Sequence, residues 1–327
     1  MKEIKITQQE ENQRLDKFLL KYMNKASKSF IYKMLRKKRI KYNAARAEGH
    51  EMLKSGDSLQ LYLSDETLAS FMEEKTLSVA ERHFGIAYED DDLLVVVKPA
   101  GVLTHPEKDS DRDTLIDQVL YYLHEKGQYE PSAQSSFTPA TCNRLDRNTS
   151  GIVLIGKTLR AVQAVNEAIR NRHIDKYYYV LVKGEVRGAG EISGSLKKDK
   201  GRNQVRVSAG AEAENSLTRY RPLAYKKGVT LLEVTLITGK THQIRVHMQS
   251  IGHPVAGDRK YADEALNSRF RQRYGLGNQF LHAYKVVWND GETALAYLKG
   301  KTFTAPLPKV LQQIYDDLFL EDMEGSS

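Results

Sequence analysis

The chain has 327 residues, of which 40% are hydrophobic, and a net charge of +8, which suits a globular protein with one large core and a small accessory domain. Its single cysteine, Cys142, excludes an intramolecular disulfide and a cysteine-based zinc cluster, and fits a reducing compartment. The first residues lack an apolar signal region and no run approaches about 20 apolar residues, so we expect a cytoplasmic protein without a membrane span.

The first 64 residues are predicted to form a compact unit of helices and strands. Apolar residues at helical spacing predict one helix around 15–22 and another around 30–35, and two strands are expected at 39–42 and 59–63. Residues 1–65 hold 15 basic and 8 acidic side chains, so +7 of the net charge lies here. This excess predicts a polyanionic partner, with a merely solvated basic surface as the alternative.

The same unit contains the run Arg14-Leu15-Asp16-Lys17-Phe18-Leu19, a basic second helix and a closing Gly56-Asp57. This pattern resembles the S-four RNA-binding domain, although the usual Val-Asn-Gly of its hairpin is Tyr42-Asn43-Ala44 here. In that family the basic helix lies against the RNA backbone, so the resemblance implies RNA contacts by Lys33, Arg36, Lys37, Lys38 and Arg39. A generic DNA-binding pair of helices is the alternative.

A larger domain is expected over residues 85–314, after an acidic and then mixed linker at 65–84. Its apolar patterns predict helices at 115–124 and 159–170 and strands at 93–97, 152–155, 177–182, 231–237 and 281–287. Because regular helices do not separate most of the strands, we predict an α+β fold with a mixed, largely antiparallel sheet.

Two further segments are predicted to be irregular. Residues 195–215 are basic, polar and glycine-containing, which indicates either a mobile surface loop or a loop that grips RNA through Arg202 and Arg206. Residues 315–327 are predicted to be an acidic, frayed tail.

The most informative motif is a charged turn at 143–151, lodged between two apolar runs. Asp146 lies on this turn, and the buried strand that follows would anchor the loop rigidly, as suits a catalytic carboxylate. Arg144 and Arg147 supply nearby cations, which keep an aspartate ionised in a partly dry pocket. An ordinary polar turn is the alternative.

The run Asn143-Arg144-Leu145-Asp146-Arg147-Asn148-Thr149-Ser150-Gly151 resembles the signature of the RluA-type pseudouridine synthases, whose usual first residue is His. Four further stretches follow in the order of that family: Val97-Lys98-Pro99-Ala100-Gly101 with His105-Pro106, Lys176-Tyr177-Tyr178, the run from Thr238 to His247, and Gly252-His253-Pro254 with Gly257-Asp258 and Tyr261. The resemblance covers roughly residues 85–310, and five ordered motifs make it specific. It implies a long mixed sheet with a cleft across its middle.

Conversion of uridine to pseudouridine breaks the bond between ribose and base, rotates the base and rejoins it through a ring carbon. A carboxylate beside the sugar can stabilise charge at the anomeric carbon, attack that carbon, or remove the proton at ribose carbon two, and all three routes stay open. Asp146 is the candidate. The resemblance implies that Arg245 pairs with it and that Tyr178 stacks on the flipped uracil. A surface ion pair for Arg245 and a half-buried strand of tyrosines are the alternatives.

Further residues of these motifs are predicted to contact the substrate: Arg144, Thr149, Lys176, His242 and Gln243. Thr241 is expected to cap a short helix that presents Arg245 to the cleft. Asn143 cannot titrate near neutral pH, so proton transfer is excluded at this position. We expect no metal, since the histidines lack a zinc-binding spacing, and no cofactor, since the reaction is redox-neutral.

The sequence therefore predicts a monomeric RNA pseudouridine synthase with an N-terminal RNA-binding module. The resemblance implies ribosomal large-subunit RNA as the substrate, with transfer RNA as an alternative. A catalytically silent RNA-binding or assembly factor and an RNA glycosidase are the rival functions. The presence of Asp146, Tyr178 and Arg245 favours the synthase over a silent binder, and hydrolysis generally recruits two carboxylates.

Overall fold

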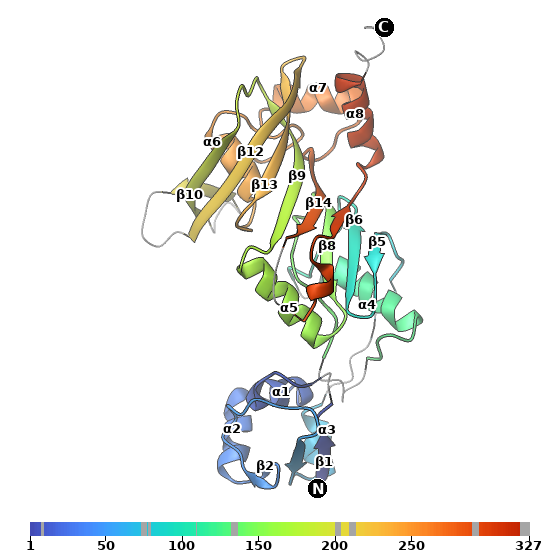
Figure 1. Ribbon diagram of the computed structural model, residues 1–327, viewed down its shortest axis with the longest axis vertical. Coiled ribbons are helices and arrows are strands. Elements are labelled where there is room, and N and C mark those ends of the chain that lie inside the picture. Colours follow the sequence, from blue (N-terminus) through green and yellow to red (C-terminus); the bar gives the residue numbers. More distant parts are fainter. Residues whose placement is uncertain are drawn as a thin grey trace.

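The computed structural model describes residues 1–7, 10–72, 77, 80–108, 110–131, 137–199, 204–208, 214–289 and 294–320. Figure 1 shows a small N-terminal unit and a larger body built around a long sheet. Each has a hydrophobic core of its own. No helix in the described ranges is long and apolar enough to cross a membrane.

The N-terminal unit packs its helices against one face of a four-stranded antiparallel sheet, whose strand order is β1-β4-β2-β3. Its elements are β1 (Lys2–Lys5), α1 (Leu15–Tyr22), α2 (Lys28–Arg36), β2 (Ile40–Tyr42), β3 (Ala45–Arg46), β4 (Ser58–Leu61) and α3 (Asp65–Ser70). Both predicted helices are confirmed, and Ser27 caps α2 by accepting a hydrogen bond from Phe30 N at 3.2 Å. The five basic residues from Lys33 to Arg39 are all exposed, opposite the apolar stripe of α2.

The predicted linker at 65–84 is wrong at its beginning, because α3 belongs to the N-terminal unit. Ser64 caps this helix, and Leu68 is buried in the N-terminal core. The ring of Phe71 packs on that of Phe30 at a centroid distance of 4.1 Å. Of the acidic residues that suggested a linker, Asp65 and Glu66 are exposed on α3, while Leu68 of the same helix is buried in the core.

The larger body is built on an eleven-stranded sheet, and its strand order is β11-β10-β12-β13-β9-β14-β8-β6-β5, with β15 on β14 and β7 on β8. The strands are β5 (Gly85–Glu89), β6 (Leu93–Lys98), β7 (Ala140–Thr141), β8 (Ser150–Gly156), β9 (Ile174–Lys183), β10 (Gly190–Asp199), β11 (Gln204–Ser208), β12 (Glu214–Lys226), β13 (Val229–Leu236), β14 (Leu281–Trp288) and β15 (Thr302–Thr304). Every pairing is antiparallel except that of β14 with β8. The predicted α+β class with a mixed, largely antiparallel sheet is confirmed.

Helices pack on both faces of this sheet (Figure 1). They are α4 (Leu115–Glu125), α5 (Leu159–Arg170), α6 (Gln243–Ser250), α7 (Glu264–Tyr274) and α8 (Lys309–Phe319), with a 3-10 turn at Ala296–Leu298. Of these, α4 and α5 lie near β8, and α6, α7 and α8 lie toward the other end of the sheet (Figure 1). Val153 and Ile155 pack in the cluster that contains α4, whereas Ile152 and Leu154 pack in the cluster that contains α5. Burial on both faces explains why β8 is a continuous apolar run.

Two segments predicted to be irregular are regular in part. Residues 195–215 lie largely in the hairpin strands β10, β11 and β12, because main-chain pairing with neighbouring strands outweighs their polar composition. Residues 200–203 and 209–213, including the candidate Arg202, lie outside the described residues, and Arg206 is on β11. Residues 315–319 are not a frayed tail but the end of α8, which buries Leu318, while 321–327 are not described.

Candidate active site

The loop that carries Asp146 connects β7 to β8 and is held at several points. Thr104 Oγ1 donates to the carbonyl of Leu145 at 2.9 Å, and Thr149 N donates to the carbonyl of Asp146 at 3.0 Å. Gly151, at the start of β8, has a φ of +121°, and a Cβ there would lie 2.2 Å from the carbonyl oxygen of Ala283. Only glycine therefore allows the close parallel contact with β14 that ends this loop.

A fully buried lysine at the end of β6, Lys98, also holds this loop in place. Lys98 Nζ donates to the carbonyl oxygens of Pro99, Val102 and Arg147 at 2.9, 2.7 and 3.0 Å. Three acceptors match the three donors of an ammonium group. Burial lowers the pKa of Lys98 to about 7, and the attraction of Asp146 opposes that shift.

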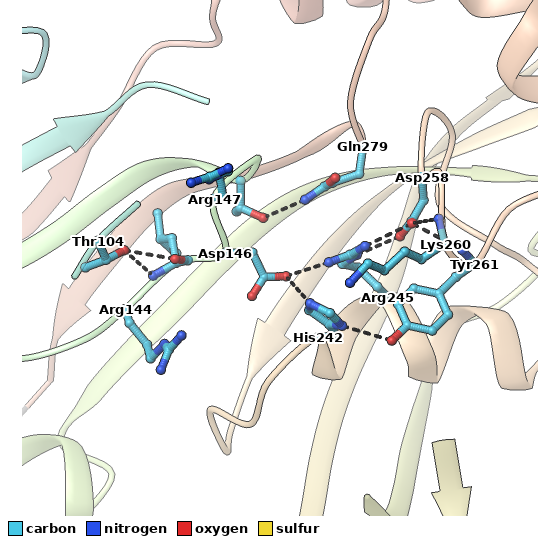
Figure 2. Close-up of polar contacts among 12 residues, drawn as sticks. Thr104, Arg144, Asp146, Arg147, His242, Arg245, Asp258, Lys260, Tyr261 and Gln279 are labelled. Carbon is cyan, nitrogen blue, oxygen red and sulfur yellow. Dashed lines mark hydrogen bonds and ion pairs between the residues drawn. The ribbon is translucent and has the colours of Figure 1, made fainter. Parts of the chain in front are cut away.

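Asp146 is paired with Arg245, which lies 99 residues downstream on α6 (Figure 2). Arg245 Nη1 donates to Asp146 Oδ2 at 2.9 Å, and the side chains are 7% and 22% exposed. Arg245 also donates from Nε and Nη2 to the two oxygens of Asp258, at 2.7 and 3.0 Å. Burial acts to lower the pKa of Arg245, but the hydrogen bonds and charges of Asp258 and Asp146 outweigh it and raise the pKa.

Burial alternates along β9 as predicted, with Lys176 and Tyr178 buried and Tyr177 and Tyr179 half-buried. Burial, together with the nearby Asp146, raises the pKa of Tyr178, so its phenol stays protonated at neutral pH. No residue in the described part of the chain makes a hydrogen bond to this hydroxyl, which leaves it available to a ligand.

His242 begins α6 in place of the predicted cap, Thr241. Its φ of +56° lies in the left-handed region, and no side-chain cap bond forms at this end of the helix. His242 Nδ1 lies 2.9 Å from the hydroxyl of Tyr261, and Nε2 lies 3.9 Å from Asp146 Oδ2. Burial lowers the pKa of His242 to about 4, with Asp146 opposing and Arg245 assisting, so the ring is neutral near pH 7.

These groups surround a pocket of about 540 Å³ that is partly open to solvent. The lining includes seven of the eight residues predicted to act on or contact the substrate: Arg144, Asp146, Thr149, Tyr178, His242, Gln243 and Arg245. Lys176 is buried on the same face of β9 as Tyr178 but does not line the pocket.

Gln243 lines the pocket, yet its side-chain amide is fully engaged within the protein. Its Nε2 donates to the carbonyl of Leu217 and to Thr218 Oγ1, and its Oε1 accepts from Thr238 Oγ1 and from Lys240 N. An amide with two donors and two acceptor sites has no capacity left. Gln243 therefore holds the turn before α6, and its amide has no donor or acceptor left for the predicted contact with the substrate.

Asn143, which stands where the resembling family has histidine, also has a structural partner. Its Oδ1 accepts from Leu154 N at 2.8 Å, and its Nδ2 donates to the carbonyl of Ile152 at 3.3 Å. Both bonds join the start of the Asp146 loop to β8, and neither requires a group that titrates.

Sequence reasoning did not assign roles to Lys98 and Asp258, although both lie in the quoted motifs. The signal available was a charged residue beside glycine or proline, in Lys98-Pro99 and in Gly257-Asp258. Nothing in either dipeptide tells which distant group the charge meets, because the partners come from other elements of the sheet. Among the described residues, no cluster of three or more histidine, cysteine or acidic side chains could hold a metal.

A family model described as RNA pseudouridylate synthase matches residues 92–250. A Haemophilus ducreyi protein named ribosomal large subunit pseudouridine synthase C is 33% identical over 322 residues, covering 97% of this chain and 95% of that protein. A protein of the same name from Vibrio vulnificus is 30% identical over 310 residues, covering 94% and 93%. The solved structure of human RNA pseudouridylate synthase domain containing 1 has a TM-score of 0.54 at 24% identity, over 72% of this chain and 87% of that one, which shows a shared fold.

Proposed function

The chain belongs to the RNA pseudouridylate synthase family and is an isomerase that converts uridine in RNA to pseudouridine, and we propose that Asp146 is the carboxylate that carries this reaction. The observation that supports this role is a carboxylate shielded on one side only. Arg245 and His242 approach Oδ2, whereas Oδ1 accepts no hydrogen bond from any described residue. One charged oxygen is thus available to the ribose of a uridine that has left its base stack.

The other groups of the pocket are suited to hold that nucleotide. The buried ring of Tyr178 offers a flat surface for the uracil, and its neutral hydroxyl can donate a hydrogen bond to the base. Arg245 stays beside Asp146 while the base excludes water, and an adjacent cation offsets the cost of desolvating a carboxylate. Arg144 is 63% exposed at the rim of the pocket, where it can bind a phosphate or fill the gap that the flipped base leaves.

We propose large-subunit ribosomal RNA as the substrate, which the names of the Haemophilus ducreyi and Vibrio vulnificus relatives support. Mapping of pseudouridines in total RNA from a deletion strain tests this proposal. One or a few positions of that RNA are expected to lose the modification, to regain it with the wild-type gene, and to stay unmodified with Asp146→Asn. Loss confined to transfer RNA would contradict the substrate assignment.

We propose that the N-terminal unit, residues 1–72, binds the RNA backbone through the five exposed basic residues from Lys33 to Arg39, which lie on α2 and directly after it. Replacing Lys33, Arg36, Lys37, Lys38 and Arg39 with glutamine should weaken RNA binding and flatten its salt dependence. The log–log slope should fall by about 0.7 for each phosphate of single-stranded RNA that the protein no longer neutralises. Binding titrations at several salt concentrations measure both effects.

The matched control replaces three exposed lysines elsewhere on the same unit, Lys5, Lys17 and Lys54, with glutamine. If the α2 cations bind the phosphates, the slope should change little in this control. Equal changes per charge in the two variants would mean that the unit acts only through its net charge.

A further inference from the structure

Arg245 divides its hydrogen bonds unequally between two carboxylates. Its Nε and Nη2 form a bidentate pair with Asp258, whereas Asp146 receives one hydrogen bond, from Nη1 (Figure 2). A guanidinium normally prefers to meet one carboxylate with two parallel bonds. Here that arrangement is taken by the carboxylate farther from the pocket, because Asp258 does not line it and Asp146 does.

Asp258 is itself held rigidly in the interior. It has no exposed surface, and its Oδ1 also accepts from the main-chain N–H groups of Lys260 and Tyr261, at 2.9 and 3.2 Å. Asn267 donates to the carbonyl of Asp258 at 3.0 Å and accepts from Gly257 N at 2.9 Å. Gly257 has a φ of +79°, and a Cβ there would lie 2.2 Å from the carbonyl oxygen of Asn278. The backbone around Asp258 therefore cannot shift easily.

We propose that Asp258 is a positioning residue: it binds the Nε and Nη2 edge of Arg245 and so fixes the orientation of the guanidinium, which then meets Asp146 at a single oxygen and leaves the other oxygen free for the substrate. The inference rests on the proposed role of Asp146. Without Asp258, the fork of Arg245 is free to turn and bind both oxygens of Asp146, which would block the reacting oxygen. The full cationic charge would also fall on Asp146 alone.

Loss of the negative charge of Asp258 is expected to shift the pH profile of kcat in one direction only. Asp258 shares Arg245 with Asp146, so its removal leaves the positive charge of Arg245 facing the active-site carboxylate alone. The other charged or titratable groups that face Asp146 are Arg245 and His242 from α6, Tyr178 from β9 and Lys98 from β6, and Lys260 acts on His242. All of these stay in place in an Asp258→Asn protein. The acidic limb of kcat should therefore move to lower pH.

The test compares wild type, Asp258→Asn and Asn267→Ala in full-length protein, with RNA tritiated at uracil carbon five. For Asp258→Asn we expect kcat to fall about 100-fold, as for a misplaced reacting group, with little change in KM and with the acidic limb shifted to lower pH. Asn267→Ala loosens the same loop but keeps the carboxylate, so its acidic limb should stay where it is in the wild type. An unchanged kcat, or a loss in both variants without a shift of the limb, would overturn the proposal.

If Asp258→Asn does not fold, Asp258→Glu replaces it, because glutamate keeps the charge but changes the reach. In that variant kcat should fall while the acidic limb stays at the wild-type pH, and either a shifted limb or a wild-type kcat would count against the proposal. Asp146→Asn is assayed beside both. Turnover by Asp146→Asn would refute the proposed function itself, whereas an inactive Asp146→Asn with a fully active Asp258→Asn would refute only the role of Asp258.

Discussion

Asp146→Asn is expected to abolish the release of tritium from RNA labelled at uracil carbon five, with kcat lower by about 10⁴-fold or more, as when a group central to the chemistry is removed. Asparagine keeps the shape of the side chain and can still accept a hydrogen bond from Arg245. It carries no negative charge, so it can neither stabilise nor attack an electron-poor anomeric carbon, nor remove a proton from ribose. RNA binding should persist, because the rim of the pocket and the N-terminal cations are unchanged.

Asp317→Asn is a matched control for this experiment. Asp317 is a carboxylate on α8 that pairs with Arg273, remote from the pocket, so its loss should leave turnover unchanged. Filter binding and label release are measured on the same preparations. Label release by Asp146→Asn at the wild-type rate would show that the reacting carboxylate is another residue.

Arg245→Met is expected to lower the free energy of unfolding by about 3–5 kcal/mol, since it leaves Asp258 buried and without its ion-pair partner. Methionine fills a similar volume but cannot bridge two carboxylates. The variant should also lose turnover, because Asp146 would be desolvated by the bound base without a cation beside it. Urea denaturation measures the first effect and tritium release the second.

Arg221→Met provides the comparison for stability. Arg221 pairs with Glu233 at 2.7 Å, but its side chain is 61% exposed, so this substitution should cost at most about 1 kcal/mol. Arg245→Lys retains a charge at the active-site position, and it should recover part of the stability without restoring the two-sided contact. Equal costs for Arg245→Met and Arg221→Met would mean that the buried bridge contributes no more than a surface pair.

Local patterns predicted the elements that carry a strong periodicity. The helices α1, α2, α4 and α5 and the buried strand β8 lie close to their predicted ranges, because a 3.6-residue stripe or an unbroken apolar run is visible in a short window. The helix α3 and the long strands β10 and β12 were missed. Their sequences are acidic or basic and polar, and what stabilises them is contact with a core or pairing with a neighbour, which composition does not record.

The active site was predicted unevenly for the same reason. The motifs pointed to Asp146, Tyr178, Arg245 and His242, and the structure brings all four to one pocket. The prediction that Thr241 caps α6 was wrong, since His242 takes the N-cap position in a left-handed conformation that its residue type does not predict. The side-chain amide of Gln243 forms its hydrogen bonds within the protein, and Lys176 is buried and does not line the pocket.

By itself, the sequence determined the kinds of group available to this protein: a carboxylate on a loop before a buried strand, an arginine on a short helix and a tyrosine in an alternating strand. Only the tertiary structure decided which of these groups pair with one another. Arg245 meets two carboxylates, one 99 residues before it and one 13 residues after it, and which of them receives two bonds depends on the packing of β8, α6 and the loop at Gly257. Hydrogen bonds depend on distances of a few tenths of an ångström, and such distances are set by the folded core as a whole.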